Sequence, residues 1–384
     1  MMRRNREIIY LTGFLLSLPM ALTSYINSSV LESYISKYYV GIIYAIASVI
    51  TIICMLIMPK ILTRFGNRKT VLVFSILFLL SLILIALGGK STIVLSAFML
   101  YFVTGNLIFA SLDIFIEDFS KDAPGIGRIR GMYLTVINLA WVVSQMMSGS
   151  IIAKSSFKGI YLISALFMAL VCVIFTLSLH DFKDPKYEKV PVLKTMGLFF
   201  KRKNILKIYF INFILKFFYA WMIIYTPIYI HEYIGFNWSE IGIIFSAMLL
   251  PFVILDVPLG RLSDQVGEKK MLIIGFVIMS ISTLFIPLFT TKSLALWIMI
   301  LFATRVGAAT VEIMSENYFF KSVAEEETYV LGFFRNTTPL SYIIAPLLAV
   351  PVLLFVPSFA YIFSVLGAIM FFGLMISLRL TDVK

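Results

Sequence analysis

The chain has few residues of the kinds that build disulfide frameworks, metal sites or nucleophilic centres. Its 384 residues include only 2 cysteines and 2 histidines. Cys54 and Cys172 lie inside apolar runs, which supports neither a disulfide framework nor a thiol metal site. His180 and His231 have no partner at metal-ligand or nucleophile spacing, and the sequence carries no nucleotide-binding motif. We therefore expect neither an enzyme nor an ATP-driven pump, and no cofactor or metal.

Charged residues are also scarce, at 14% of the chain, whereas hydrophobic residues make up 60%. This composition leaves too little polar surface to cover a water-facing body, so it predicts an integral membrane protein. Apolar runs of about 20 residues recur along the chain, and each matches the roughly 30 Å hydrocarbon layer of a bilayer. The pattern predicts an all-α protein with twelve transmembrane helices.

The net charge of +12 would suggest a nucleic-acid partner in a soluble protein. Here the 32 lysines and arginines fall mainly between the apolar runs on one side of the predicted membrane. That asymmetry is the positive-inside bias, so both termini are predicted to be cytoplasmic in a multi-pass protein of the cell membrane. The expected partners are a small-molecule solute, membrane lipids and a coupling ion such as the proton. No nucleic acid is expected, and the chain is expected to act as a monomer.

A polar interruption at residues 180–204 divides the apolar runs into two groups of six. It contains Pro185, Pro191, several lysines and a short amphipathic piece that suits the inner membrane surface. The predicted domains are an N-terminal six-helix bundle (1–179), a cytoplasmic linker (180–204) and a C-terminal six-helix bundle (205–384). The predicted helices span residues 8–27, 39–62, 70–87, 92–119, 131–153, 159–179, 205–229, 240–261, 271–289, 294–319, 329–354 and 359–378.

The loop at residues 260–270, GRLSDQVGEKK, lies between two of the apolar runs. It resembles the signature loop of the major facilitator superfamily, G-x-L-x-D-[RK]-x-G-[RK]-[RK], in which the matching residues are Gly260, Leu262, Asp264, Gly267 and Lys269. Gln265 and Glu268 depart from it. A weaker copy, PKILTRFGNRK at residues 59–69, keeps Gly66 but has Thr63 in place of the Asp.

The resemblance implies two pseudo-symmetric six-helix bundles that transport a solute across the membrane. An internal repeat agrees with it, because Asp113 and Glu117 recur 199 residues later as Glu312 and Glu316. Gly66 recurs 201 residues later in the second signature loop. Two homologous halves are typical of such transporters.

Both pairs of acids are spaced i, i+4 and so share a helix face near the predicted cytoplasmic end. In the superfamily, acids at these helix ends are often paired with basic residues that lead into the next helix, which implies a cytoplasmic gate. A solvated helix end is the alternative. The candidate gate or coupling residues are Asp113, Glu117, Arg130, Asp256, Asp264, Glu312, Glu316 and Arg335.

Lys216 and Arg305 each lie eleven residues into a predicted helix, about 17 Å along it, where we expect no matching carboxylate. An ionisable side chain inside a bilayer is costly, so each is a hypothesis for a functional site. The alternative is a structural anchor held by backbone carbonyls or tyrosines. The candidate substrate-binding residues are Lys216, Arg305, Asn106, Asn138, Asn212 and Asn336.

The leading hypothesis is a secondary active transporter that works by alternating access. The two cations favour an anionic solute, with protons as the coupling ion. One alternative is a proton-coupled exporter of lipophilic or cationic compounds, although the Gly-Pro-rich antiporter motif of the superfamily is missing from the helix over 131–153. Another is a non-transporting receptor or scaffold with the same fold.

Overall fold

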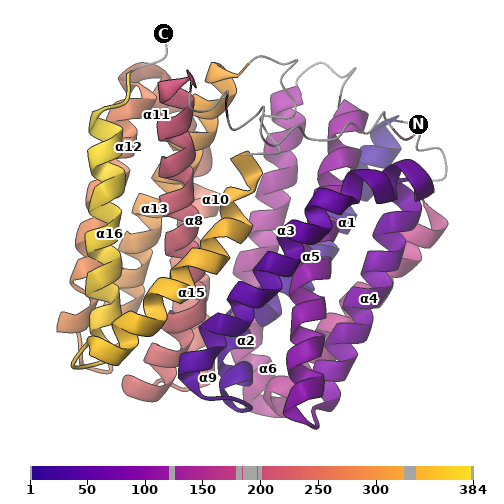
Figure 1. Cartoon of the computed structure of the whole chain (residues 1–384), viewed down its shortest axis with the longest axis horizontal. Helices are drawn as coiled ribbons and strands as arrows, with labels where there is room; N and C mark the ends of the chain where they lie inside the picture. The colour runs from indigo at the N-terminus through magenta and orange to yellow at the C-terminus, as the bar shows by residue number, and fades with distance from the viewer. Residues whose placement is uncertain are drawn as a thin grey trace. The chain divides into compact units, whose positions relative to one another are not determined.

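The computed structural model describes residues 2–120, 126–178, 184, 197, 201–323 and 334–381 (Figure 1). Within these ranges, ten helices are long and apolar enough to cross a membrane. The predicted all-α, multi-pass membrane protein is therefore confirmed, while the count of twelve spans stays a prediction. The chain divides into two compact units, Met1–Lys189 and Val190–Lys384. Most of the predicted linker over 180–204 lies outside the described residues.

The first unit contains a short helix that the sequence did not predict, and one helix with a sharp internal bend. Its helices are α1 (Met2–Ser24), α2 (Asn27–Glu32), α3 (Lys37–Phe65), α4 (Asn67–Leu87), α5 (Ser91–Ser120) and α6 (Ile126–Leu177). Ser156 divides α6 into two helices, because its φ of 59° lies in the left-handed region. The two parts of α6 correspond to the helices predicted over 131–153 and 159–179.

The second unit follows the predicted order with one correction. Its elements are α8 (Lys203–Ile228), η1 (Tyr229–Tyr233), α9 (Trp238–Leu249), α10 (Pro251–Ile254), α11 (Asp256–Val266), α12 (Glu268–Leu284), η2 (Ile286–Leu288), α13 (Leu294–Ser322), α15 (Thr337–Phe355) and α16 (Tyr361–Leu378). A continuous helix over 240–261 is wrong, since the chain breaks between α9 and α10 and again between α10 and α11. Pro251 stands at the first break, where it has no N–H to continue the helical hydrogen bonds.

The two units repeat one set of helix neighbours. In the first unit, α1 packs against α6, α4 packs against α5 and α6, and α3 packs against α5. In the second unit, α8 packs against α15, α12 packs against α13 and α16, and α9 packs against α13. Helices at matching places in the two halves of the sequence therefore make matching contacts, as expected of a protein built from two homologous halves.

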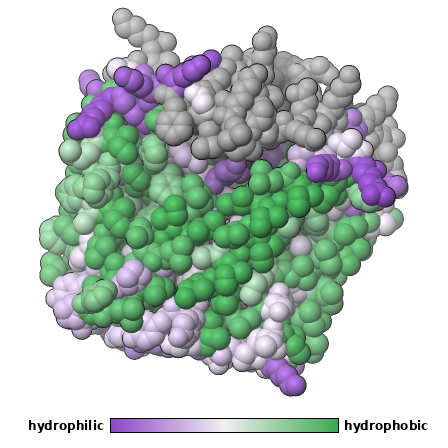
Figure 2. All heavy atoms as spheres, in the orientation of Figure 1, coloured by the Kyte–Doolittle hydropathy of each residue, from purple (hydrophilic) through white to green (hydrophobic). Residues whose placement is uncertain are grey.

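Large hydrophobic side chains on the outside of the helices mark surfaces suited to lipid. On α15, Leu347, Leu348, Leu354 and Phe355 are all exposed. Figure 2 shows hydrophobic residues along this helix, with hydrophilic residues gathered near helix ends. Such a surface would be unfavourable in water and is compatible with the hydrocarbon layer of a bilayer.

The weaker signature copy, at residues 59–69, has an acidic residue beside it that comes from a distant part of the sequence. The backbone N–H of Asn67, the first residue of α4, donates to Oδ1 of Asp184 at 2.6 Å. A Cβ atom on Gly66, which has a φ of 77°, would lie 2.5 Å from the other oxygen of Asp184. A carboxylate is favourable at this helix N-terminus, where N–H groups lack intrahelical acceptors. Asp184 thus places a negative charge beside a loop whose own acid is replaced by Thr63.

The stronger copy departs from the superfamily pattern at Glu268, and this residue is paired. Its Oε1 lies 2.6 Å from Nζ of Lys321, although the Glu268 side chain is only 3% exposed. Glu268 is the first residue of α12, and Lys321 is next to the last residue of α13. The pair therefore ties the start of α12 to the end of α13.

The N-terminus of α9 has a capping box that offers a test of local stability. Oδ1 of Asn237 accepts from the backbone N–H of Glu240 at 2.9 Å, and Oε2 of Glu240 accepts from that of Asn237 at 2.8 Å. Asn237→Ala removes one of these bonds, so we expect the free energy of unfolding to fall by about 1 kcal/mol. Unfolding of the purified protein in detergent measures the change. Asn237→Ser, which can still cap, is the control, and an equal loss in both variants would contradict the role of the cap.

Candidate functional site

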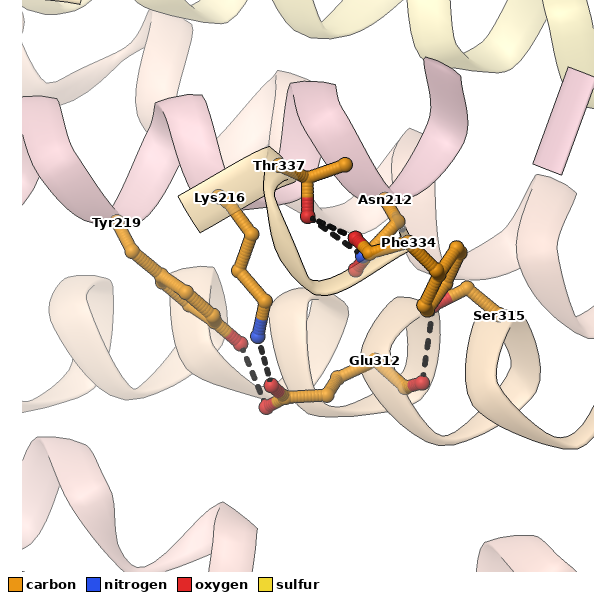
Figure 3. A network of polar contacts seen from close by, with 7 residues as sticks. All are labelled: Asn212, Lys216, Tyr219, Glu312, Ser315, Phe334 and Thr337. Carbon is orange, nitrogen blue, oxygen red and sulfur yellow. Dashed lines mark hydrogen bonds and ion pairs between the residues drawn. The ribbon is translucent and has the colours of Figure 1, made fainter. Parts of the chain in front are cut away.

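A cluster of charged and polar side chains lies within the second unit, where α8, α13 and α15 meet (Figure 3). Nζ of Lys216, on α8, is 2.5 Å from Oε1 of Glu312, on α13. The hydroxyl of Tyr219, one turn further along α8, donates to Oε2 of Glu312 at 3.0 Å. Both oxygens of this carboxylate therefore have a donor from α8.

The expectation that Lys216 has no carboxylate at its depth is wrong. Glu312 is the nineteenth of the 29 residues of α13, so ten residues of helix still follow it. Because α13 is longer than the roughly 20 residues that a membrane span requires, distance from its outer end is a poor measure of depth. Glu312 was expected at the cytoplasmic mouth, whereas it contacts a residue in the middle of α8.

Arg305 lies two turns before Glu312 on the same helix and is only 1% exposed. Its Cζ atom is 5.0 Å from the ring centre of Phe218 and 5.7 Å from that of Tyr219. Its Nε and Nη1 atoms have no hydrogen-bond partner in the part of the chain that the structure describes. A guanidinium remains protonated, and aromatic faces offset only part of the cost of burying its charge. Arg305 therefore has donors to offer to an anionic group.

A second set of polar contacts joins α8 to the start of α15 (Figure 3). Asn212, one turn before Lys216, donates from Nδ2 to Oγ1 of Thr337 at 2.9 Å. The Thr337 hydroxyl in turn donates to the carbonyl of Phe334 at 2.9 Å. Oδ1 of Asn212 is buried and has no hydrogen-bond partner among the described residues. Asn212 thus provides a neutral acceptor one turn from Lys216.

The charged groups of the cluster do not balance. Among the described residues of the cluster, two cations, Lys216 and Arg305, accompany the carboxylate of Glu312, which leaves one net positive charge. Burial of an uncompensated charge is unfavourable, so binding of an anion would stabilise the cluster. No group of three or more His, Cys, Asp or Glu side chains within the described ranges is arranged to hold a metal ion.

The structure brings Lys216, Arg305, Asn212 and Glu312 together in one unit. Three other candidates, Asn106, Asp113 and Asn138, belong to the first unit, where Nδ2 of Asn106 donates to the Phe102 carbonyl of its own helix at 2.8 Å.

The predicted gate stays a prediction. Glu316 lies on α13, Arg335 is exposed, and Asn336 immediately precedes α15 without capping it through its side chain. The remaining candidate side chains, which are outside the described set, are those of Glu117, Arg130, Asp256 and Asp264.

Tyr219 and Phe218 were not predicted from the sequence, which indicated only tyrosines in general as partners of the cations. A signal was present, since Tyr219 lies three residues after Lys216 and so on nearly the same helix face. Phe218 is one residue from Tyr219, and its contact with Arg305 depends on how α8 and α13 pack. That packing is not readable from spacing along one helix.

Two homologous units of membrane-spanning helices, with a partly buried charged cluster in one of them, are typical of a polytopic membrane transporter. The family model described as Major Facilitator Superfamily matches residues 9–247 and 225–384, and the chain belongs to this superfamily. A function in secondary transport follows from that membership. Comparison with curated proteins gave no match.

The fold is also similar to that of a solved structure described as "Structural insights into substrate recognition in proton dependent oligopeptide transporters". The two structures superpose with a TM-score of 0.74, and the similarity covers 98% of each chain. Sequence identity is 11%, so the likeness concerns the fold.

Proposed function

We propose that the protein moves a small anionic solute across the cell membrane by alternating access, and that Arg305 binds the anionic group. The observation that carries this proposal is the buried Arg305 guanidinium, whose Nε and Nη1 have no hydrogen-bond partner among the described residues. A carboxylate or phosphate would supply acceptors and the missing negative charge. Both termini are proposed to be cytoplasmic, with the gate formed by the acids and arginines named from the sequence.

Glu312 is the proposed site of proton coupling. In its ionised form, Glu312 pairs with Lys216, with 2.5 Å between Oε1 of Glu312 and Nζ of Lys216. Protonation would remove its charge and weaken that contact, so the cluster would carry two positive charges and bind an anion more tightly. Proton and anion would then travel together. The solved structure of similar fold concerns proton-dependent transporters, which supports the same mode of coupling for this chain.

A second candidate function is the export of lipophilic or cationic compounds in exchange for protons. It draws on the aromatic surroundings of Glu312, since the Tyr219 ring is 6.0 Å from the ring of Phe252 and 5.2 Å from Nζ of Lys216. A cationic solute would have to displace Lys216 from Glu312. The net positive charge of the cluster disfavours this.

Ligand binding by purified protein tests the proposal. The probes are acetate, succinate and inorganic phosphate against a lipophilic cation such as tetraphenylphosphonium, and ligand-dependent thermal stabilisation gives the readout. We expect anions to bind, and Arg305→Gln to weaken their binding by about 2 to 5 kcal/mol, or roughly 30-fold or more. Lys292→Gln is the control, because Lys292 pairs with Glu240 near the start of α9. Binding of the cation but of no anion would favour the second candidate.

A further inference from the structure

The geometry points to Tyr219 as a positioning residue. We infer that its hydroxyl holds Glu312 on Lys216 and so leaves Arg305 available to the solute. This inference rests on the proposed function, because it assigns a role at the same anion site.

Tyr219 contacts all three charged groups of the cluster. Its hydroxyl donates to Oε2 of Glu312 at 3.0 Å, while its ring centre is 5.2 Å from Nζ of Lys216 and 5.7 Å from Cζ of Arg305. The Tyr219 ring also makes an edge contact with Phe252, at 6.0 Å between ring centres. The Tyr219 side chain is therefore placed to influence whether the Glu312 carboxylate contacts Lys216 or Arg305.

The two oxygens of Glu312 explain how that choice is made. Lys216 takes Oε1, and the Tyr219 hydroxyl takes Oε2. Without the Tyr219 hydroxyl, Oε2 of Glu312 loses its hydrogen-bond donor. A partly buried carboxylate oxygen without a donor is unfavourable in free energy. Arg305 is the neighbouring cation with donors to spare, on the same helix and against the same ring. A carboxylate directed at Arg305 would compete with the anionic solute.

The position of the Phe218 ring agrees with this assignment. Arg305 lies closer to Phe218 than to Tyr219, with 5.0 Å against 5.7 Å from Cζ to the two ring centres. Phe218 has no hydroxyl, so it supports the guanidinium by its face without offering a hydrogen bond to Glu312. The two neighbouring aromatic residues thus have different roles. The Phe218 ring packs against the Arg305 guanidinium, and the Tyr219 hydroxyl positions the Glu312 carboxylate.

A double-mutant cycle tests the inference, with succinate and inorganic phosphate as probes and dissociation constants as the readout. Tyr219→Phe keeps the ring and removes the hydroxyl, and we expect anion binding to weaken by about tenfold, the lower end of the effect of a hydrogen bond to a charged group. Adding Glu312→Gln to Tyr219→Phe should restore binding to within about twofold of the Glu312→Gln protein, because the competing charge is gone. A merely structural role for the hydroxyl would not be rescued in this way.

Tyr225→Phe is the matched control. Tyr225 lies on the same helix, and its buried hydroxyl has no hydrogen-bond partner in the described part of the chain. The same chemical change should leave anion binding unchanged there.

Two results would overturn the inference: an unchanged affinity in Tyr219→Phe, or the same loss with and without Glu312→Gln. Failure of the proposed function is recognised separately. The unaltered protein would then bind no anion, or Arg305→Gln would bind anions as well as the unaltered protein, whatever the Tyr219 variants do.

Discussion

Lys216→Met is expected to lower the free energy of unfolding by about 3 kcal/mol, because Oε1 of Glu312 loses its charged donor. The two side chains are 19% and 27% exposed, so the pair is shielded more than a surface ion pair, whose removal usually costs about 0 to 1 kcal/mol. Methionine preserves most of the volume and removes the charge. The loss is therefore expected to report the broken contact between Lys216 and Glu312 rather than a cavity.

The double variant Lys216→Met, Glu312→Leu separates these causes. Replacement of both partners by apolar residues leaves no carboxylate oxygen without its donor, so most of the lost stability should return. Denaturant or thermal unfolding of the purified proteins in the same detergent supplies the measurement. A double variant as unstable as Lys216→Met alone would show that packing around α8, and not the ion pair, determines the effect.

Gly307→Val is expected to destabilise the second unit by roughly 3 kcal/mol or more, or to prevent folding, and Gly307→Ala by about 1 to 3 kcal/mol. A Cβ atom at Gly307 would lie 2.6 Å from the backbone oxygen of Gly275 and 2.6 Å from the backbone nitrogen of Met279, both on α12. Backbone atoms of a packed helix cannot rotate away as a flexible side chain does. The two helices would have to separate, and α12 also packs against α16.

Gly260→Ala is the control for the glycine series. Gly260 lies within α11, and a Cβ atom there would meet no atom of the described residues within 4 Å. Alanine is favoured over glycine in a helix by about 1 kcal/mol, so this substitution should leave stability unchanged or raise it. Thermal unfolding of both variants in one detergent compares them. A similar loss in the two would show that glycine at position 307 is not required by the approach of α12.

Much of the fold was predictable, because membrane spans follow from length and apolarity alone. The repeat of Asp113 and Glu117 as Glu312 and Glu316 further indicated two homologous halves, and the matching helix contacts of the two units agree with it. The break at Pro251 was missed because the apolar run continues through it. Hydropathy measures transfer to lipid and does not detect a missing backbone donor.

The candidate site was predictable only in part. Lys216 and Arg305 were identified because a charge inside an apolar run is exceptional wherever it lies. The partners were not, since the contact of Glu312 with Lys216 depends on how far α13 extends beyond the membrane span and how it packs on α8. Counting residues from one end of a helix gives neither the extension of α13 nor its packing on α8. Tyr219 was not predicted for a related reason. A tyrosine inside an apolar run carries no large free-energy penalty, so it does not stand out among the many aromatic residues.

The hydrogen bond from Asn67 to Asp184 determines where the chain can be cut into separately expressed halves. The two residues are 117 positions apart, so the acceptor at the start of α4 belongs to the stretch that follows the last helix of the first unit. A first fragment that stopped at Leu177, the end of α6, would lack that acceptor. A fragment that ended at Lys189, the boundary of the first compact unit, would keep it. Coexpressed fragments should therefore reassemble better when they are divided at the second position.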